Sequence, residues 1–358
     1  MKVYFYHTQD LSRIYKEWRE GIFPGHLLYG ATHLPRHGIE TIMHPFKPFY
    51  NNRLKLTLLT AWRILTCGKS YDALYASSFM GIELIILLRA IRIYRKPIVI
   101  WHHQPIVTAK NPLRQLISRL FYKGIDHAFF FSDYLISQSL KSGKMPRERM
   151  QMIHWGADID FYDRVIRETG EGEHGRTGFI STGKERRDMP TLVNAFAQTE
   201  QHLDIHIAYG AGKDDYRKIF SSISLPKNVK VNFINGLCPY ELSLKVCRAQ
   251  CAVICCMPTN YTVGLTTLVE ALALGLPVIC TSNPTFAFDI DKEEVGITVP
   301  SGDIKAWENA IERIATDTKE AERMGRNARA LAERLFNLNN YSAEIAHTLK
   351  AVIRNSRS

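Results

Sequence analysis

The sequence predicts an α/β protein of two Rossmann-like domains that face a central cleft. The chain has 358 residues, which favours two domains over one small core. Short apolar runs alternate with helix-length segments from end to end, as expected for buried parallel strands joined by helices. A polar stretch with four glycines interrupts this alternation near the middle. Repeated βα units of this kind predict doubly wound sheets with right-handed crossovers.

Apolar runs mark the predicted strands in order along the chain. The break at 163–178 is polar and has no apolar period, so it is predicted to be a linker between domains at 1–162 and 179–335. The last segment, 336–358, is expected to form a helix that packs back on the first domain. The predicted strands lie at 2–6, 39–43, 73–76, 97–101, 127–131, 150–154, 179–181, 205–209, 229–234, 251–257 and 277–281.

Positive charge is concentrated in the first half of the chain. The net charge is +11. Residues 1–160 hold 22 Lys and Arg against 11 Asp and Glu, whereas residues 161–358 hold 24 of each kind. This asymmetry predicts that the first domain meets an anionic partner, either a membrane leaflet or a phosphorylated acceptor. Nucleic acid fits the charge, but no recognition motif supports it.

The composition is that of an ordinary globular enzyme, and nothing in it predicts disorder or a fibrous class. The chain begins with a strand-like run and not with a signal peptide, and its apolar stretches are too short to span a membrane. The seven cysteines lack the paired spacing of a zinc site, so buried reduced thiols in a cytoplasmic protein are expected.

The segment 251–280 carries the sharpest local signal. It reads as a strand, a loop, a short helix closed by Gly275 and another strand. A helix that begins at Thr266 or Thr267 directs unpaired N–H groups at the cleft, where they can bind a diphosphate. Threonine hydroxyls add donors, and a glycine lets a ligand approach the backbone closely. The candidate residues are Gly264, Thr266, Thr267 and Leu268.

Glu270 has two interpretations. The spacing from Thr267 to Glu270 fits a capping box, in which the carboxylate bonds back to the Thr267 amide. Alternatively, a carboxylate one turn into this helix can bind the two hydroxyls of a ribose. The local sequence alone leaves both interpretations open.

The run from Gly264 to Ile279 resembles the donor motif of family 4 retaining glycosyltransferases of GT-B fold, the glycosyl transferases group 1. In that family two glutamates separated by seven residues precede a small residue, Gly and Pro-Val. The second glutamate matches Glu270, and the resemblance implies that it binds the nucleotide ribose. The first does not match, because Thr262 stands in its place. The resemblance therefore leaves the contacts to the sugar open, with Asn260 or Thr262 as neutral substitutes.

The segment 183–192 is similar to the motif that opens the second domain in this family. There an Arg and a Lys bind the donor diphosphate. The counterparts here are Lys184 and Arg187, with the two residue types exchanged, next to Gly183. A solvated charge run is the alternative for these residues. Lys and Arg both neutralise phosphate, but their geometries differ.

Further matches extend along the chain, including one at 153–158. The segment 233–237 resembles the loop that holds the base through backbone groups near Leu237. The loop at 23–27, followed by a helix-like stretch at 28–34, is the counterpart of a glycine loop near the donor or acceptor. It keeps Gly25 with His26 but lacks the usual second glycine.

Two histidines end the strand at 97–101, where the family places a histidine near the transferred sugar. Strand alternation puts His102 and His103 on opposite sides, so only one faces the cleft, and we favour His103. Histidine pairs also occur in metal sites, but no third metal ligand lies at a useful spacing from His102 and His103. The resemblance implies a metal-independent enzyme without a cofactor.

The resemblance implies transfer of a hexose from a UDP- or GDP-sugar with retention of configuration, by front-face attack. The first domain then binds the acceptor and the second binds the donor. Basic amphipathic segments with aromatic edges, such as 46–56 and 110–123, favour an anionic membrane surface and a lipid, lipid-linked or polysaccharide acceptor. This predicts a cytoplasmic protein held peripherally on the inner face of the membrane. A sugar-nucleotide epimerase and a catalytically degenerate binding protein are the rival hypotheses.

Overall fold

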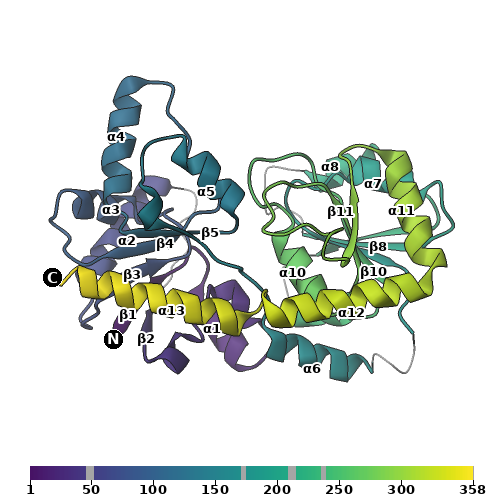
Figure 1. The fold of residues 1–358 in the computed structure, drawn as a ribbon, viewed down its shortest axis with the longest axis horizontal. Helices are drawn as coiled ribbons and strands as arrows, with labels where there is room; N and C mark the ends of the chain where they lie inside the picture. Colours follow the sequence, from purple (N-terminus) through teal and green to yellow (C-terminus); the bar gives the residue numbers. More distant parts are fainter. Residues whose placement is uncertain (46–51, 171–174, 209–214, 235–238, 358) are drawn as a thin grey trace. The chain divides into compact units, whose positions relative to one another are not determined.

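The computed structural model describes residues 1–45, 52–170, 175–208, 215–234 and 239–357. The chain forms two compact units. The first consists of Met1–Trp155 with Leu338–Ser358, and the second is Gly156–Asn337. Each described unit is built on a six-stranded parallel sheet with helices around it (Figure 1). The predicted α/β class with two Rossmann-like units is confirmed.

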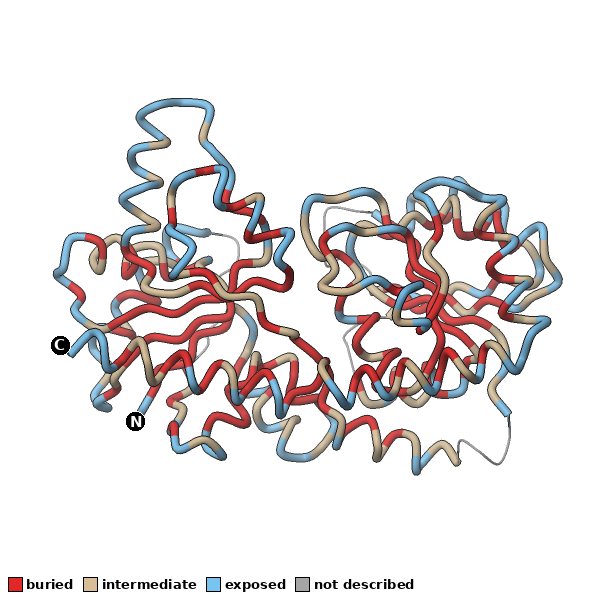
Figure 2. Tube along the Cα trace, in the orientation of Figure 1, coloured by how far each residue is buried: buried red, intermediate tan, exposed pale blue. Residues whose placement is uncertain are grey.

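The first sheet has the strand order β2-β1-β3-β4-β5-β6. Its central strands are buried over their whole length, because each is an apolar run covered on both faces. Figure 2 shows the same pattern, with buried segments gathered in the middle of each unit. The strands are β1 Lys2–Tyr6, β2 Glu40–Met43, β3 Ala73–Ala76, β4 Ile98–Trp101, β5 His127–Phe130 and β6 Met150–Met152.

Side-chain caps fix the starts of several helices in the first unit. Asn52, Asn111 and Ser132 each accept a backbone N–H of the first helical turn. The final helix belongs to this unit, where the Tyr341 hydroxyl donates to the His26 carbonyl at 3.0 Å. The helices are α1 Leu11–Arg19, α2 Arg53–Leu65, α3 Glu83–Ala90, α4 Pro112–Lys123, α5 Asp133–Leu140 and α13 Leu338–Asn355, with 3-10 turns η1 Gly25–Leu28, η2 Leu34–His37 and η3 Arg147–Arg149.

The second sheet has the order β12-β11-β10-β7-β8-β9, so the strand order reverses between β7 and β10. One of its faces packs on a core that includes Phe179, Ile205 and Trp307. The strands are β7 Phe179–Gly183, β8 Leu203–Ala208, β9 Val229–Ile234, β10 Cys251–Ile254, β11 Val278–Thr281 and β12 Gly296–Val299. The helices are α6 Ile159–Thr169, α7 Met189–Phe196, α8 Tyr216–Ser221, α9 Pro239–Cys247, α10 Leu265–Ala273, α11 Ile304–Thr316 and α12 Thr318–Arg334.

The predicted linker at 163–178 is wrong over its first part, because residues up to Thr169 belong to helix α6. Asp158 caps this helix, and Phe161, Tyr162 and Val165 form its buried face. Its exposed face is polar, which hid the helical period, and the αL residue Gly170 ends it. The two units meet in sequence at 155–156, before this helix.

Three histidines, of which His44 and His102 are buried and His127 is partly buried, make the first unit sensitive to acid. Burial lowers the pKa of His44, His102 and His127 to about 4 each. The unfolded chain binds protons near pH 6.5, so the stability that these neutral rings contribute is present above that pH and is lost between pH 6.5 and 4. We expect the Tm of the first unit to fall by several degrees from pH 7 to pH 5, measured by calorimetry. Scans at pH 7 and pH 8, where the rings stay neutral, are the control. An unchanged or higher Tm at pH 5 would contradict the assignment.

Candidate functional site

Arg187 lies at the centre of a polar cluster near the carboxyl ends of β7 and β10. Its side chain is buried, with the residue only 4% exposed. Its Nε donates to the Thr182 carbonyl at 3.0 Å, and its Nη2 donates to the Thr267 hydroxyl at 3.2 Å. Its Nη1 lies 3.0 Å from Cys256 Sγ and 3.3 Å from the Glu185 carbonyl. The guanidinium therefore ties the loop after β7 to helix α10 and to the end of β10.

All of these partners of Arg187 are neutral groups. In the part of the chain that the structure describes, no carboxylate lies within ion-pair distance of its guanidinium. Burying a cation without a countercharge is costly, and buried charges in proteins are normally paired. An anionic ligand that reaches the cluster would supply the missing negative charge.

Two glycines flank the guanidinium. Gly183 has a φ of +134°, and a Cβ at this position would lie 2.3 Å from Arg187 Nη2. Gly264 has a φ of +87°, and its Cβ would lie 2.7 Å from Ile254 Cγ2. Side chains at either position would be strained and would collide with their surroundings. The predicted importance of these glycines thus has a local steric basis.

Helix α10 begins at Leu265, one or two residues before the predicted start at Thr266 or Thr267. Its N-cap is Gly264, which makes no side-chain cap bond. The amides of the first turn have no acceptor within the helix, and the helix dipole places partial positive charge there. The bond between Thr267 and Arg187 brings this helix end and the guanidinium together. Both features favour an anion at one place.

The structure gives Leu268 a different role from the predicted one of binding the diphosphate. Its backbone N–H already donates to the Gly264 carbonyl at 3.0 Å, and its side chain is fully buried. It is a structural part of the helix, because the helix starts earlier than predicted. Thr266 is exposed beside it, while Thr267 is buried and also lies 3.2 Å from the Thr182 hydroxyl.

Glu270 does not act in the capping box that its spacing suggested. The helix is capped at Gly264, so Thr267 is already inside the first turn and is not the N-cap residue. Glu270 is half-buried and lies beside Tyr162 of α6. Burial, together with the charge and hydrogen bonding of the Glu270 carboxylate, raises the pKa of the fully buried Tyr162. The Tyr162 hydroxyl thus stays neutral beside the carboxylate.

The remaining predicted residues of the second unit lie around this cluster. Lys184 is exposed in the loop between Gly183 and Arg187. Thr262, which stands at the position of the first glutamate in the motif that this segment resembles, has a buried hydroxyl without a hydrogen-bond partner among the described residues. Asn260 is exposed. Leu237 lies outside the described residues.

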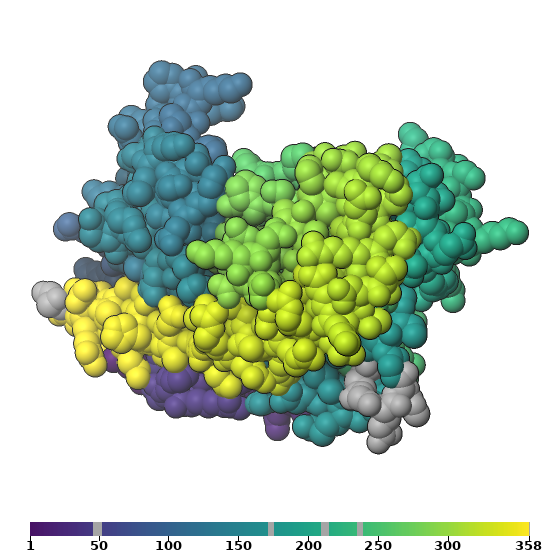
Figure 3. Space-filling model, turned by 45° about the vertical axis from the view of Figure 1, so that its right-hand side comes forward, coloured from purple at the N-terminus to yellow at the C-terminus, as the bar shows by residue number. Residues whose placement is uncertain are grey.

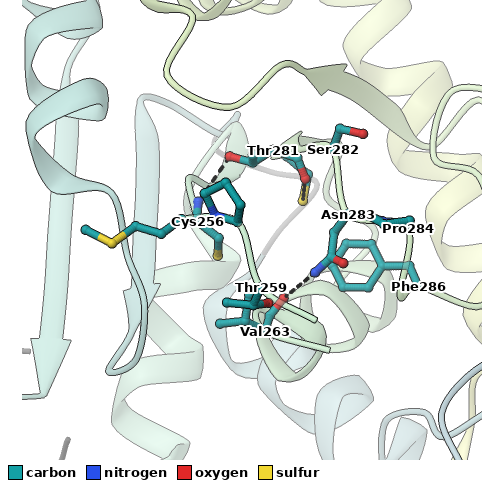
Figure 4. Close-up of a pocket in the computed structure, with 11 residues that line it drawn as sticks. Cys256, Thr259, Val263, Thr281, Ser282, Asn283, Pro284 and Phe286 are labelled. Atoms are coloured by element: carbon teal, nitrogen blue, oxygen red, sulfur yellow. Dashed lines mark hydrogen bonds between the residues drawn. The ribbon is translucent and has the colours of Figure 1, made fainter. Parts of the chain in front are cut away.

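A small pocket opens beside this cluster, at the carboxyl ends of β10 and β11 (Figure 4). Its volume is about 180 Å³. The Cys256 N–H donates to the Thr281 hydroxyl at 3.0 Å, and Asn283 Nδ2 donates to the Val263 carbonyl at 3.3 Å. The wall formed by residues 281–286 was not predicted from the sequence. Adjacent parallel strands end at one edge of a sheet, and this was the signal that could have identified it.

Sequence reasoning also missed the groups that hold Arg187 and Glu270 in place. The Tyr216 hydroxyl accepts the Arg187 backbone N–H at 2.9 Å. Thr182 and Cys256 contact the guanidinium, and Tyr162 contacts the Glu270 carboxylate. None of these was a candidate site residue in the sequence, although Cys256 lies within the segment 251–280.

The two candidate histidines of the first unit, His102 and His103, differ in burial and in hydrogen bonding. His102 is buried, donates from Nδ1 to the Gln104 carbonyl at 2.5 Å and accepts the Tyr122 hydroxyl at Nε2 at 2.9 Å. Both of its ring nitrogens are thus used inside the unit. His103 is partly exposed, with Nε2 donating to the Ser77 carbonyl at 2.8 Å.

The loop near Gly25 also differs from its prediction. Gly25 and His26 are buried in the 3-10 turn η1, and the helix-like stretch expected at 28–34 is a series of turns.

No group of three His, Cys, Asp or Glu side chains within the described residues is arranged to hold a metal ion. No described helix is both long and apolar enough to cross a membrane.

The fold of the whole chain is similar to that of solved GT-B glycosyltransferases. Anabaena HepE in complex with UDP superposes with a TM-score of 0.66 at 18% identity, covering 98% of this chain and 100% of that one. Sucrose-phosphate synthase from Thermosynechococcus elongatus has a TM-score of 0.75 at 16% identity, covering 99% of each chain. A glycosyltransferase from Rickettsia africae has a TM-score of 0.66 at 13% identity, covering 99% of this chain and 98% of that one.

The two parallel sheets and these superpositions show that the chain has the GT-B fold of glycosyltransferases. The family model for glycosyl transferases group 1 matches residues 171–331, which lie within the second unit. No curated protein sequence matches the chain.

Proposed function

We propose that the protein transfers a hexose from a UDP- or GDP-sugar to a hydroxyl of a lipid, lipid-linked or polysaccharide acceptor, with retention of configuration, at the inner face of the cell membrane. The observation that carries this proposal is the buried guanidinium of Arg187, which has neutral partners beside the start of α10. A diphosphate supplies the negative charge that this cluster lacks.

Each part of the donor has a counterpart in the second unit. The diphosphate binds Arg187, the Thr267 hydroxyl and the amides of the first turn of α10, with Lys184 as a second cation. The ribose hydroxyls bind the Glu270 carboxylate on the side that Tyr162 does not occupy. HepE was solved with UDP, with UDP and glucose, and with UDP-glucose, which favours a uridine nucleotide here.

Thr262 and the pocket at 281–286 are the groups that we assign to the sugar. The Thr262 hydroxyl, which has no hydrogen-bond partner among the described residues, offers a neutral hydrogen bond where a carboxylate stands in the motif that this segment resembles. A carboxylate at this position would repel a negatively charged group on the sugar, whereas a neutral hydroxyl does not. The donor sugar is therefore expected to be either an uncharged hexose or a hexose that bears a negative group.

The reaction needs no protein nucleophile. The bond from the anomeric carbon to the diphosphate breaks, and the bond to the acceptor oxygen forms on the same face of the sugar while the proton of the acceptor hydroxyl passes to an oxygen of the departing diphosphate. The protein contributes positioning and stabilisation of the charge that develops on the departing diphosphate. Arg187 and the α10 amides are already fixed in place, so they stabilise this charge with little reorganisation. In the first unit we assign a ligand contact to His103 and not to His102, because both ring nitrogens of His102 already form hydrogen bonds within the unit.

The test is a turnover assay with UDP- and GDP-hexoses and membrane lipid extract as the acceptor. We expect one donor to give a glycosylated lipid whose anomeric configuration, determined by NMR, equals that of the donor. Inverted configuration would overturn the retaining assignment. Interconversion of the donor sugar without an acceptor would instead identify an epimerase, and binding without turnover of any donor would identify a binding protein.

A further inference from the structure

Helix α4 is amphipathic, but its apolar face points away from the protein. None of its residues is buried. Leu113, Leu116, Ile117 and Leu120 are 65%, 65%, 53% and 41% exposed, and their spacing puts them on one face. The helix projects from the first unit in both Figure 1 and Figure 3. An ordinary surface helix has the opposite arrangement, with its leucines against the core.

Polar and aromatic side chains hold α4 to the first unit. Gln115 accepts the Ala109 N–H at 2.9 Å and donates to the Ser142 carbonyl at 3.1 Å. Tyr122 bonds to the buried His102, and Phe121 packs edge-on against Phe79. The orientation of the helix is therefore fixed by specific bonds, and the outward direction of its leucines is a stable feature of the fold.

Helix α2 presents a second apolar stripe of the same kind. Leu54, Leu58, Trp62 and Leu65 are 69%, 52%, 62% and 54% exposed, while the opposite face of the helix is buried. Helix α3 packs against both α2 and α4, so the three helices form one layer of the first unit. We call these eight exposed residues of α2 and α4 the apolar stripes. Monomeric proteins rarely expose so many large apolar side chains on neighbouring elements.

Positive charge surrounds the stripe on α4. Residues 84–125 contain eight Lys and Arg and no Asp or Glu. Two of the eight are engaged within the unit, since Arg89 pairs with Asp126 at 2.7 Å and Lys96 covers the Tyr71 ring. The others are exposed, and they are Arg92, Arg95, Lys110, Arg114, Arg119 and Lys123.

We propose that the apolar stripes form a face that docks on a bilayer of anionic phospholipid, with the leucines of α4 and Trp62 entering the acyl boundary and the flanking cations binding lipid phosphates. Apolar side chains flanked by Lys and Arg match the layering of such a surface. A second copy of the chain fits less well, because a symmetric contact would bring the same cations together. The inference deepens the proposed function by fixing the membrane partner, but the docking itself does not depend on the transfer reaction.

The test is co-sedimentation of the full chain with vesicles of phosphatidylcholine alone or with 30% phosphatidylglycerol, without any sugar donor. The wild-type protein is expected to bind the anionic vesicles and to be released by salt. Changing Leu113→Ser, Leu116→Ser and Leu120→Ser together should lower the partition coefficient at least tenfold, and Arg114→Gln with Arg119→Gln should weaken binding severalfold and flatten its salt dependence.

The matched control changes two exposed apolar residues of the second unit, Leu225→Ser with Ile304→Ser, and should leave the partition coefficient unchanged. Equal binding by the triple variant and the control would overturn the proposal. So would a dimer in analytical ultracentrifugation that only the triple variant loses. Nucleotide-induced thermal shifts, measured on the same samples, report the donor site separately, so a failure of docking is distinguishable from a failure of the proposed function.

Discussion

Replacing Arg187 with alanine is expected to lower kcat/KM for the nucleotide-sugar donor by about 10²- to 10³-fold, or about 2.7–4 kcal/mol of transition-state stabilisation. The guanidinium is fixed by four neutral groups of the protein, so its charge is available to the diphosphate without reorganisation. Steady-state kinetics with the preferred donor checks this. Arg187→Lys keeps the charge but not the fork that spans Thr182 and Thr267, so it should recover only part of the loss.

Arg176 provides the matched control for this substitution. It lies in the same unit, and its guanidinium donates to the backbone carbonyls of Leu274 and Gly275 at 2.7 and 2.6 Å. Arg176→Ala should therefore lower the Tm while leaving kcat/KM within about twofold of wild type in the folded protein. If both variants lose activity in proportion to their stability, Arg187 has a structural role and the donor assignment fails.

Replacing Glu270 with alanine is expected to weaken nucleotide binding by about 10- to 100-fold, because hydrogen bonds to a charged group contribute about 1.5–3 kcal/mol. The carboxylate is half-buried and lies beside the fully buried Tyr162, whose pKa it raises. Calorimetric titration with the nucleoside diphosphate measures the loss. Tyr162→Phe keeps the ring but removes the hydroxyl, and a weaker effect in the same direction is expected.

The chemistry of the Glu270 contact is tested with deoxynucleotides. The wild-type protein should discriminate against 2′- and 3′-deoxynucleoside diphosphates, and Glu270→Ala should bind them about as well as the ribonucleotide. Retained discrimination in the alanine variant would show that another group reads the ribose.

Much of the fold could be predicted from the sequence, because buried parallel strands are continuous apolar runs. The runs at 2–6 and 73–76 coincide with β1 and β3. The run at 229–234 also coincides with β9, although only its first residue is buried. Two elements, β12 and α6, were not predicted from the sequence, and each has a physical reason. Strand β12 is short and begins with glycine, and two of its four residues are only partly buried. Helix α6 has a narrow buried face inside a polar segment, so it resembled a linker.

The site could be predicted only where its binding residues lie close together in one segment of the sequence. The motif around Glu270 identified the start of a helix near a candidate anion site. The isolation of Arg187 from carboxylates could not be predicted, because its partners Cys256 and Thr267 are 69 and 80 residues away in sequence. Periodicity identified α4 as amphipathic but could not tell which face points outwards. That depends on Gln115 and Tyr122, which bond to distant parts of the first unit.

The most direct test of the central claim is calorimetric titration of the wild-type protein and Arg187→Ala with UDP, GDP and ADP. The buried cation beside α10 predicts that one of these nucleotides binds the wild-type protein with one site per chain, and that Arg187→Ala weakens this binding at least tenfold. Equal affinity of both proteins for the nucleotide, or no binding of any of the three to the wild-type protein, would contradict the assignment of this cluster to a donor diphosphate.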